Sequence, residues 1–315
     1  MTAPGNMLHP RVLTVIRLGV SALFVAVVAV AVVRSGRELS FQVHGVWWLA
    51  LGILPAAALV AGKGIKWQVV VRGLAPRVTF REAVRSYVAA IPYSLVTPGR
   101  VGEVARTMFL PYPNVHGMAG VGAVVLDKVT DLICLLWWIA LGLWFFVDLP
   151  GLALAACAAA LCLTPLRLWL GAGHRVIRRL GVWPAFQQKL EAAIVDLRAL
   201  SRGRIVTAVG LGVVCFGIEW VQYWAFFNAL APTGVHVPFG EAVGIMAIVT
   251  LANVAQISFA GIGVREGLAA LMLASTLPPA SAATAAFAVF ALDQALPGVV
   301  GLFAKPIVLK AEDSE

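Results

Sequence analysis

The segment FREAVRSYVAAIPYSLVTPGRVGEVAR, residues 80–106, decides how this chain folds. Its apolar part, residues 83–96, would be only about 21 Å long as a helix, which is too short to cross a bilayer comfortably. Thr97-Pro98-Gly99 then interrupts it, because proline removes a backbone donor and glycine permits a sharp turn. A chain can reverse inside a membrane only where protein or water covers the freed backbone groups. The segment therefore predicts a re-entrant helical hairpin over residues 80–111.

The composition places this hairpin in a membrane protein. Of the 315 residues, 61% are hydrophobic and only 12% are charged, whereas a soluble domain is about a quarter charged and about half apolar. Such a chain cannot cover a surface in water, which excludes a soluble enzyme, a disordered protein and a nucleic-acid-binding domain. We expect an all-α polytopic membrane protein that forms a single transmembrane domain over residues 1–315.

Long apolar runs supply the predicted spans. We expect the first of them, Val12–Val33, to be a retained helix rather than a cleaved signal peptide. The others are the runs Val46–Val71, Met118–Val147, Leu152–Leu170 and Ile205–Leu230, followed by a broken apolar stretch, Glu241–Ala304. These runs predict about six full spans together with two re-entrant hairpins.

The basic residues predict the orientation of these spans. Residues 63–106 and residues 167–204 each contain eight Lys or Arg and two acids, whereas segments 147–150 and 231–238 contain no basic residue. The positive-inside rule then places both basic blocks and both termini in the cytoplasm. Residues 171–204 suit either an amphipathic helix on anionic lipid or a solvated connecting helix. We expect a multi-pass protein of the cell (plasma or inner) membrane.

Two parts of the chain resemble one another. Phe80-Arg-Glu82-Ala83-Val84 recurs as Phe239-Gly-Glu241-Ala242-Val243, and each copy precedes a glycine pair with an acid. The distance from the phenylalanine to that acid is 23 residues in the first copy and 27 in the second, which differ by about one helical turn. The first copy leaves the predicted cytoplasmic side and the second leaves the outside, as in the inverted repeats of transporters.

The inverted repeat has defined halves, residues 45–147 and 205–305. The second half contains its own predicted hairpin, residues 241–277. Two alternatives stay open: short matches arise by chance in Ala-, Val- and Gly-rich sequence, and residues 241–277 could form two full spans. The pair Gly261 and Gly263 also suits tight packing between helices.

Ten charged residues fall within membrane depth in this arrangement. Each costs about 2.5–3.5 kcal/mol at a helix centre, so they must pair, face a wet cavity or lie at shallow depth. Asp127 and Asp131 are four residues apart and share a helix face, and Lys128 can reach Asp131. The ten are Arg100, Glu103, Arg106, Asp127, Lys128, Asp131, Glu219, Arg265, Glu266 and Asp293.

The hairpin breaks are predicted to place several of these charges beside helix N-termini, where an arginine and oriented N–H groups suit a phosphodiester. The break residues are Pro98, Gly99, Gly102, Gly261 and Gly263. The predicted residues that bind a lipid head group are Arg100, Glu103, Arg106, Arg265 and Glu266. The predicted residues that balance charge or carry a coupling ion are Asp127, Lys128, Asp131, Glu219 and Asp293.

A structural alternative accompanies these roles. The same charges could form internal salt bridges that hold the hairpins in place, and an arginine could exchange a carboxylate for a phosphate. For Glu219, which lies near Gln222 in the sequence, a packing hydrogen bond is the favoured role.

Three motifs resemble the signatures of a known family, the lysylphosphatidylglycerol synthase transmembrane (flippase-like) family, which includes the membrane half of the multiple peptide resistance factor. They are Pro98–Arg106, Asp127–Asp131 and Gly261–Glu266, and the similarity extends from about Lys63 to Ala304. Asp127-Lys128 stands where the family more often has Glu-Arg. The resemblance implies a lipid translocase, or a domain accessory to one. The resemblance also implies that the aminoacyl-transferase half is missing, so lysyl-lipid synthesis is not expected from this polypeptide.

The leading expectation is a lipid flippase that moves a phospholipid or polyprenyl phosphate between leaflets. No G-x-x-x-x-G-K-[ST] motif occurs, so transport would be passive or ion-coupled. Membrane lipids are the expected partners, with a homodimer and a separate lipid-modifying enzyme as possible additions. We expect no nucleic acid, cofactor, metal or catalytic residue.

Two other functions stay open. One is an intramembrane lipid-pyrophosphate phosphatase, for which Ser94 and Ser258 are the only nearby nucleophile candidates. The other is a non-transporting membrane partner of a lipid-modifying enzyme.

Overall fold

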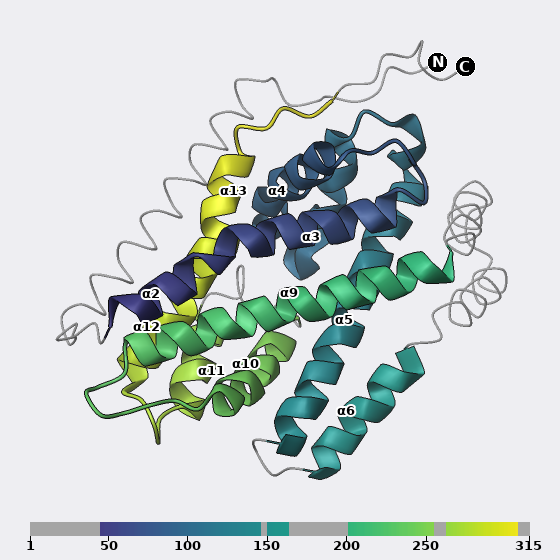
Figure 1. Cartoon of the computed structure of the whole chain (residues 1–315). Helices are drawn as coiled ribbons and strands as arrows, with labels where there is room; N and C mark the ends of the chain where they lie inside the picture. Colours follow the sequence, from purple (N-terminus) through teal and green to yellow (C-terminus); the bar gives the residue numbers. More distant parts are fainter. Residues whose placement is uncertain (1–44, 146–149, 164–200, 255–262, 308–315) are drawn as a thin grey trace. The chain divides into compact units, whose positions relative to one another are not determined.

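A computed structural model of the chain describes residues 45–145, 150–163, 201–254 and 263–307, which all belong to one compact unit, Val43–Glu315. These residues are helical, and no strand occurs among them (Figure 1). The predicted all-α class is therefore confirmed for this part. The predicted first span Val12–Val33, most of the linker 171–204 and the break residue Gly261 lie outside the described residues.

The longest apolar helices lie side by side (Figure 1). Helices α2 (Val46–Ile53) and α3 (Pro55–Val71) join into one 26-residue stretch because Leu54 keeps helical dihedral angles, φ −56° and ψ −39°. Pro55 opens α3 and, because it has no N–H, removes one backbone hydrogen bond from the continuous stretch at this point. Helix α9 (Arg202–Ala229) has 28 residues and packs along both. Both stretches are long and apolar enough to cross a membrane, as predicted from their sequences.

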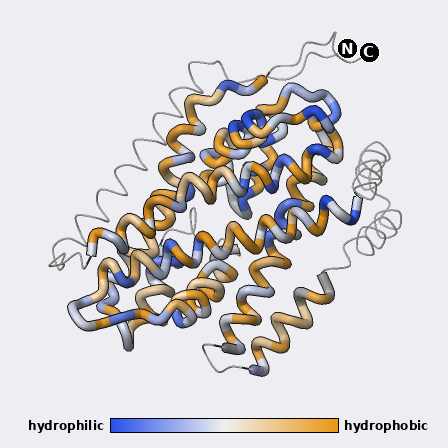
Figure 2. Tube along the Cα trace, in the orientation of Figure 1, coloured by the Kyte–Doolittle hydropathy of each residue, from blue (hydrophilic) through white to orange (hydrophobic). Residues whose placement is uncertain are grey.

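Helix α5 (Met118–Phe145) has 28 residues and packs against α6 (Pro150–Leu163). Figure 2 shows mainly hydrophobic residues along the second half of α5 and along α6. The charged residues of α5 lie in its first half, at Asp127, Lys128 and Asp131. Helix α5 thus matches the predicted run Met118–Val147, and its three charged residues lie within about one helical turn of one another.

The first predicted hairpin is present as a helix pair. Helix α4 (Phe80–Val96) is followed by the 3₁₀ helix η1 (Pro98–Phe109), and the short η2 (Pro113–Val115) leads to α5. Thr97 between them is extended, as expected for a residue before proline. A Cβ on Gly102 would lie 2.0 Å from the Tyr93 carbonyl oxygen, so only glycine permits this approach of η1 to α4. The Tyr112 hydroxyl donates to Glu82 over 3.1 Å, which joins the two ends.

The second predicted hairpin is closed in the same way. Helices α10 (Phe239–Val254) and α11 (Val264–Met272) pack together, and the Thr276 hydroxyl donates to Glu241 over 2.8 Å. Glu241 occupies the position of Glu82 in the two similar sequence copies. Glu82 and Glu241 therefore each accept a hydroxyl hydrogen bond at the start of the two helix pairs, and the inverted repeat stays a prediction.

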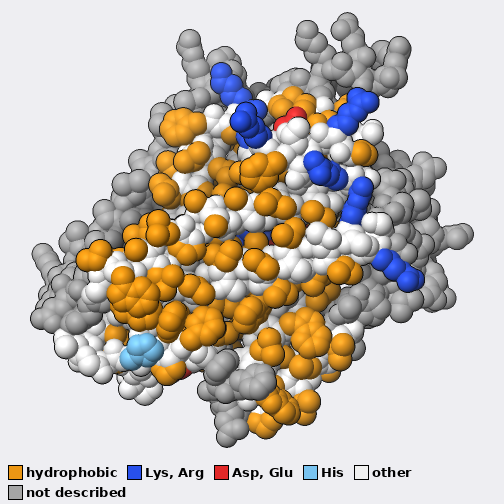
Figure 3. Space-filling view, viewed as in Figure 1, with side chains coloured by type: hydrophobic (Ala, Val, Ile, Leu, Met, Phe, Trp, Pro, Cys, Tyr) orange, Lys and Arg blue, Asp and Glu red, His pale blue; other side chains and the backbone are white. Residues whose placement is uncertain are grey.

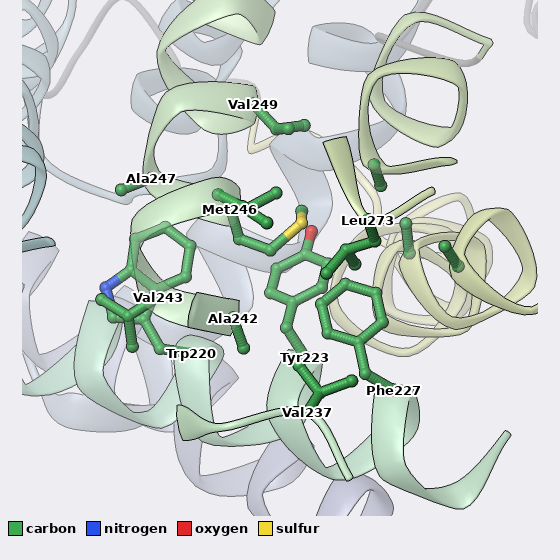
Figure 4. Close-up of a cluster of buried hydrophobic side chains, with 14 of the residues drawn as sticks. Trp220, Tyr223, Phe227, Val237, Ala242, Val243, Met246, Ala247, Val249 and Leu273 are labelled. Carbon is green, nitrogen blue, oxygen red and sulfur yellow. The ribbon is translucent and has the colours of Figure 1, made fainter. Parts of the chain in front are cut away.

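The C-terminal part completes the bundle through α12 (Pro279–Phe290), the π-helical turn η4 (Ala291–Ala295) and α13 (Leu296–Gly301). Together these form the third stretch that is long and apolar enough to cross a membrane. The main hydrophobic core lies between α9, α10 and α11. There Trp220, Tyr223 and Phe227 belong to one buried cluster with Met246 and Leu273 (Figure 4).

Exposed basic side chains and a group of packed aromatic rings lie at opposite ends of the bundle. Lys and Arg side chains gather near one end of the face in Figure 3, and hydrophobic side chains cover most of the rest. At the other end Trp48 packs edge-on against Trp224, with 4.8 Å between ring centroids, and His236 adjoins both rings. Aromatic and basic ends around an apolar band are typical of membrane proteins. Within the described ranges the exposed basic residues, here called the arginine end, are Arg72, Arg77, Arg81, Arg85, Arg202 and Lys305.

Candidate functional site

Charged side chains from α3, η1 and α5 form one connected network, here called the first ion cluster. Its members are Lys66, Arg100, Glu103, Arg106, Asp127, Lys128 and Asp131. Asp127 lies at its centre with 4% of its surface exposed. It accepts from Lys66 Nζ at 2.8 Å and from Arg106 Nη1 at 2.6 Å. Charge-assisted pairs of this kind are about twice as strong as neutral hydrogen bonds.

The other carboxylates of the first ion cluster are equally well paired. Glu103 contacts Arg106 and also Lys128, whose Nζ lies 2.8 Å from Glu103 Oε2. Asp131 contacts Lys66 at 2.6 Å and Lys128 at 3.5 Å. The guanidinium of Arg106 also lies 4.8 Å from the ring centroid of Tyr87. Each carboxylate therefore has at least two cationic partners, which fixes three elements to one another.

Arg100 differs from the other cations of the first ion cluster, because among the described residues it has no short contact with a carboxylate. Its side chain is 34% exposed, and its Nη1 lies 3.9 Å from Glu103, a weak contact. Its backbone has φ +54°, which non-glycine residues rarely adopt. Its Nη2 donates to Gln294 Oε1 over 2.6 Å, so Arg100 links the first hairpin to η4.

The structure corrects one part of the orientation argument. That argument counts Lys63, Lys66 and Arg106 in a cytoplasmic basic block, but Lys66 is 2% exposed and Arg106 is 3% exposed. Lys66 sits in an apolar helix, where a charge needs a counter-ion. It finds Asp127 and Asp131, which lie 61 and 65 residues away along the chain. Its place inside the run Val46–Val71 was the signal that could have identified it.

A second set of polar side chains, here called the second polar cluster, gathers α3, α9, α11 and η4. Lys63 Nζ lies 3.2 Å from Glu219 Oε2, so Glu219 forms a salt bridge rather than only the packing hydrogen bond predicted for it. Gln222 Nε2 donates instead to Asp293 Oδ1 over 3.2 Å and to the Gly52 carbonyl over 3.1 Å. The full set is Lys63, Glu219, Gln222, Tyr223, Arg265, Glu266 and Asp293.

Arg265 is held beside the start of α11. Its Nε lies 3.3 Å from Glu266 Oε1, and its guanidinium lies 4.4 Å from the Phe290 ring centroid. Glu266 also accepts from the backbone N–H of Gly263 over 2.6 Å and so caps the helix. Gly263 itself has φ +88°, which glycine adopts without strain.

Several polar atoms of the second polar cluster lack partners. In the described part of the chain, six buried side-chain polar atoms have no hydrogen-bond partner, and three of them are Arg265 Nη2, Gln222 Oε1 and Asp293 Oδ2. Leaving such an atom unpaired costs about 1–3 kcal/mol. Buried polar groups without partners call for an explanation such as a ligand, an ion or a proton. Half of these six atoms thus belong to the second polar cluster, whereas the first ion cluster contributes one, Arg106 Nε.

The predicted site residues consequently fall into two groups. Those from residues 100–131 meet in the first ion cluster, and Glu219, Arg265, Glu266 and Asp293 meet in the second polar cluster. Sequence reasoning missed Lys63, Lys66 and Tyr223. It assigned Gln222 only to packing.

Comparison with known proteins adds the family. The model of the family described as the lysylphosphatidylglycerol synthase TM region matches residues 14–301, a range that includes both clusters. No curated protein and no solved structure matches the chain.

Proposed function

Because the chain belongs to the lysylphosphatidylglycerol synthase TM region family, we propose that it is a lipid translocase that moves a phospholipid or polyprenyl phosphate between leaflets. The observation that carries this proposal is Arg265. It is a cation with 5% exposure, it lies between apolar helices beside a helix start, and its Nη2 has no partner among the described residues. A lipid phosphate supplies the acceptor that this atom lacks, and arginine matches phosphate geometry well.

Arg265 and Arg100 are the two proposed phosphate-binding residues. The pair between Arg265 and Glu266 is long at 3.3 Å, and Arg100 lies 3.9 Å from Glu103. Either arginine can therefore exchange its carboxylate for a phosphate oxygen at low cost. Arg106 is bound by two carboxylates and two aromatic rings, so we assign it a structural role.

The proposed orientation places the arginine end in the cytoplasm. Exposed arginines flank the start of the first hairpin and the start of α9, whereas Trp48 and Trp224 lie at the opposite end. This follows the positive-inside rule. The two hairpins would then open toward opposite leaflets, as alternating access to one site requires.

Liposomes with fluorescently labelled phospholipid test the proposal. The wild-type protein should expose inner-leaflet label to an external quencher, and the double variant Arg100→Ala/Arg265→Ala should lose this activity. The control Arg77→Ala/Arg81→Ala removes the same charge from the arginine end and should retain it. Equal scrambling by the wild type and by Arg100→Ala/Arg265→Ala would remove the assigned roles.

A further inference from the structure

Asp293 and Gln222 form a buried pair in which two oxygens have no partner. Gln222 is 0% exposed and Asp293 is 5% exposed. The amide Nε2 of Gln222 donates to Asp293 Oδ1, while Asp293 Oδ2 and Gln222 Oε1 accept nothing in the described part of the chain. A carboxylate and an amide oxygen are both acceptors, so they cannot satisfy one another. The O–H of a protonated acid can donate to the amide oxygen, and one proton then supplies both missing bonds.

The charges that face Asp293 do not compensate a carboxylate. Lys63 on α3 is paired with Glu219 of α9 at 3.2 Å, so two acids share one cation. Arg265 on α11 is paired with Glu266. Tyr223 of α9 is a neutral phenol, and the sequences of α12 and α13 contain no charged residue.

No salt bridge to Asp293 occurs among the described residues. An ionised carboxylate buried without a partner is costly, and such a group takes up a proton instead. The electrostatic surroundings and the unpaired oxygens thus independently favour the protonated, neutral form of Asp293.

Asp293 lies in the π-helical turn η4, and the residue after Asp293 in the same turn, Gln294, contacts the first hairpin. Gln294 Oε1 accepts from Arg100 Nη2 over 2.6 Å. Adjacent residues of one turn therefore reach the buried amide of Gln222 and the partly exposed guanidinium of Arg100. Single π-helical turns inside α-helices occur frequently at functional sites.

We propose that Asp293 binds a proton from water as a neutral acid paired with Gln222, and that η4 couples this proton to lipid movement. In the bound state an O–H bond forms at Oδ2 and donates to Gln222 Oε1. Loss of the proton to water leaves a second negative charge beside Glu219, which disfavours a lipid phosphate at Arg100 or Arg265. Proton and anionic lipid are therefore favoured together. The coupling rests on the proposed translocase function, whereas the proton site does not.

Infrared spectroscopy of the purified protein tests the proton site without transport. The spectrum at pH 7 should contain the C=O stretch of a protonated, buried carboxyl group, and Asp293→Asn should remove this band. Glu241→Gln makes the same chemical change in the second hairpin and should retain it. Asparagine can make both bonds of the protonated acid, so the thermal midpoint of Asp293→Asn should equal or exceed that of the wild type. Absence of a band that depends on Asp293 overturns the proton site.

Liposomes with an imposed pH gradient test the coupling. The gradient should raise lipid movement several-fold in the wild type and in Glu241→Gln, and it should have no effect on Asp293→Asn. Equal stimulation of Asp293→Asn and the wild type overturns the coupling. An Asp293-dependent band in a wild-type protein that moves no lipid retains the proton site, and it removes both the translocase function and the coupling.

Discussion

The two polar clusters contain the same kinds of residue but differ in how completely they are paired. In the first ion cluster Glu103, Asp127 and Asp131 each contact at least two cations. In the second polar cluster Glu219 has a salt bridge to Lys63, and Asp293 has none among the described residues. Three buried atoms of this cluster have no partner in the described part of the chain, against one in the first ion cluster, Arg106 Nε. Buried charges that are fully satisfied rigidify a structure, whereas partly satisfied ones leave capacity for a ligand. The difference separates a scaffold from a site.

The largest expected effect comes from Asp127→Ala, which tests the scaffold. The change leaves Lys66 and Arg106 buried and short of a partner, and breaking one side of a buried ion pair costs about 3–5 kcal/mol. Thermal unfolding in detergent should show a large fall in stability. Lys128→Ala removes a 38% exposed side chain and leaves Glu103 with Arg106, so it should cost about 1 kcal/mol or less. Equal midpoints for the two variants would contradict a scaffold role.

The second prediction separates activity from stability. Arg265→Ala should reduce lipid scrambling about tenfold or more, which corresponds to about 1.4 kcal/mol of lost phosphate binding. Its melting temperature should fall less than that of Arg106→Ala, because Arg265 has one salt bridge and Arg106 has two. Arg265→Lys should be intermediate in activity, because it keeps the charge and loses the fork. Normal scrambling by Arg265→Ala would contradict the assignment of the second polar cluster as the site and of the first ion cluster as the scaffold.

The third prediction concerns the first hairpin. Gly102→Ala would place a methyl group 2.0 Å from the Tyr93 carbonyl oxygen, and overpacking of this kind costs about 1–3 kcal/mol. Gly267→Ala in α11 meets nothing within 4 Å and should stabilise its helix by about 0.5–1 kcal/mol. Thermal unfolding of each variant beside the wild type should show a lower midpoint for Gly102→Ala and a higher one for Gly267→Ala. A stable Gly102→Ala variant would show that η1 does not lie against α4 so closely.

The smallest expected effect is at the start of α4, on the arginine end. Thr79 and Glu82 form a reciprocal cap, and Thr79→Ala should cost about 1 kcal/mol. Burial alone raises the pKa of Glu82, but hydrogen bonds from Thr79 and Tyr112 outweigh it and lower the pKa below its usual value. The cap should therefore stabilise the protein above about pH 4.3, the unfolded pKa, and weaken as pH falls through the folded pKa. Thermal unfolding of the wild type and of Thr79→Ala across this pH range should show that the difference between their midpoints shrinks in acid.

Local patterns in the sequence were sufficient for several features of the fold. The break at Thr97 falls where α4 ends, because proline restricts the residue before it. The pairing of Lys128 with Asp131 follows from helical spacing. Both depend on residues within one turn of each other.

The features that sequence reasoning missed all depend on distant parts of the chain. Lys66 and Asp127 are 61 residues apart, and Gln222 and Asp293 are 71 residues apart. Periodicity within one helix contains no information on which helix faces it. A charge count also treats a basic residue that faces water and one enclosed by carboxylates as equal, which is why the buried position of Lys66 was missed.

The turn η4 has one further consequence, in the rotational phase of the helix that follows it. A π turn contains one more residue than an α turn, and one residue rotates a helix by about 100°. With this offset α13 presents Gly298 and Gly301 to α4, where a Cβ on Gly301 would lie 2.2 Å from the Val88 carbonyl oxygen. Regularising the turn would swing this glycine face away and bring valine side chains against α4. A change at Asp293 that altered the turn would thus rotate α13 about its axis relative to the first hairpin.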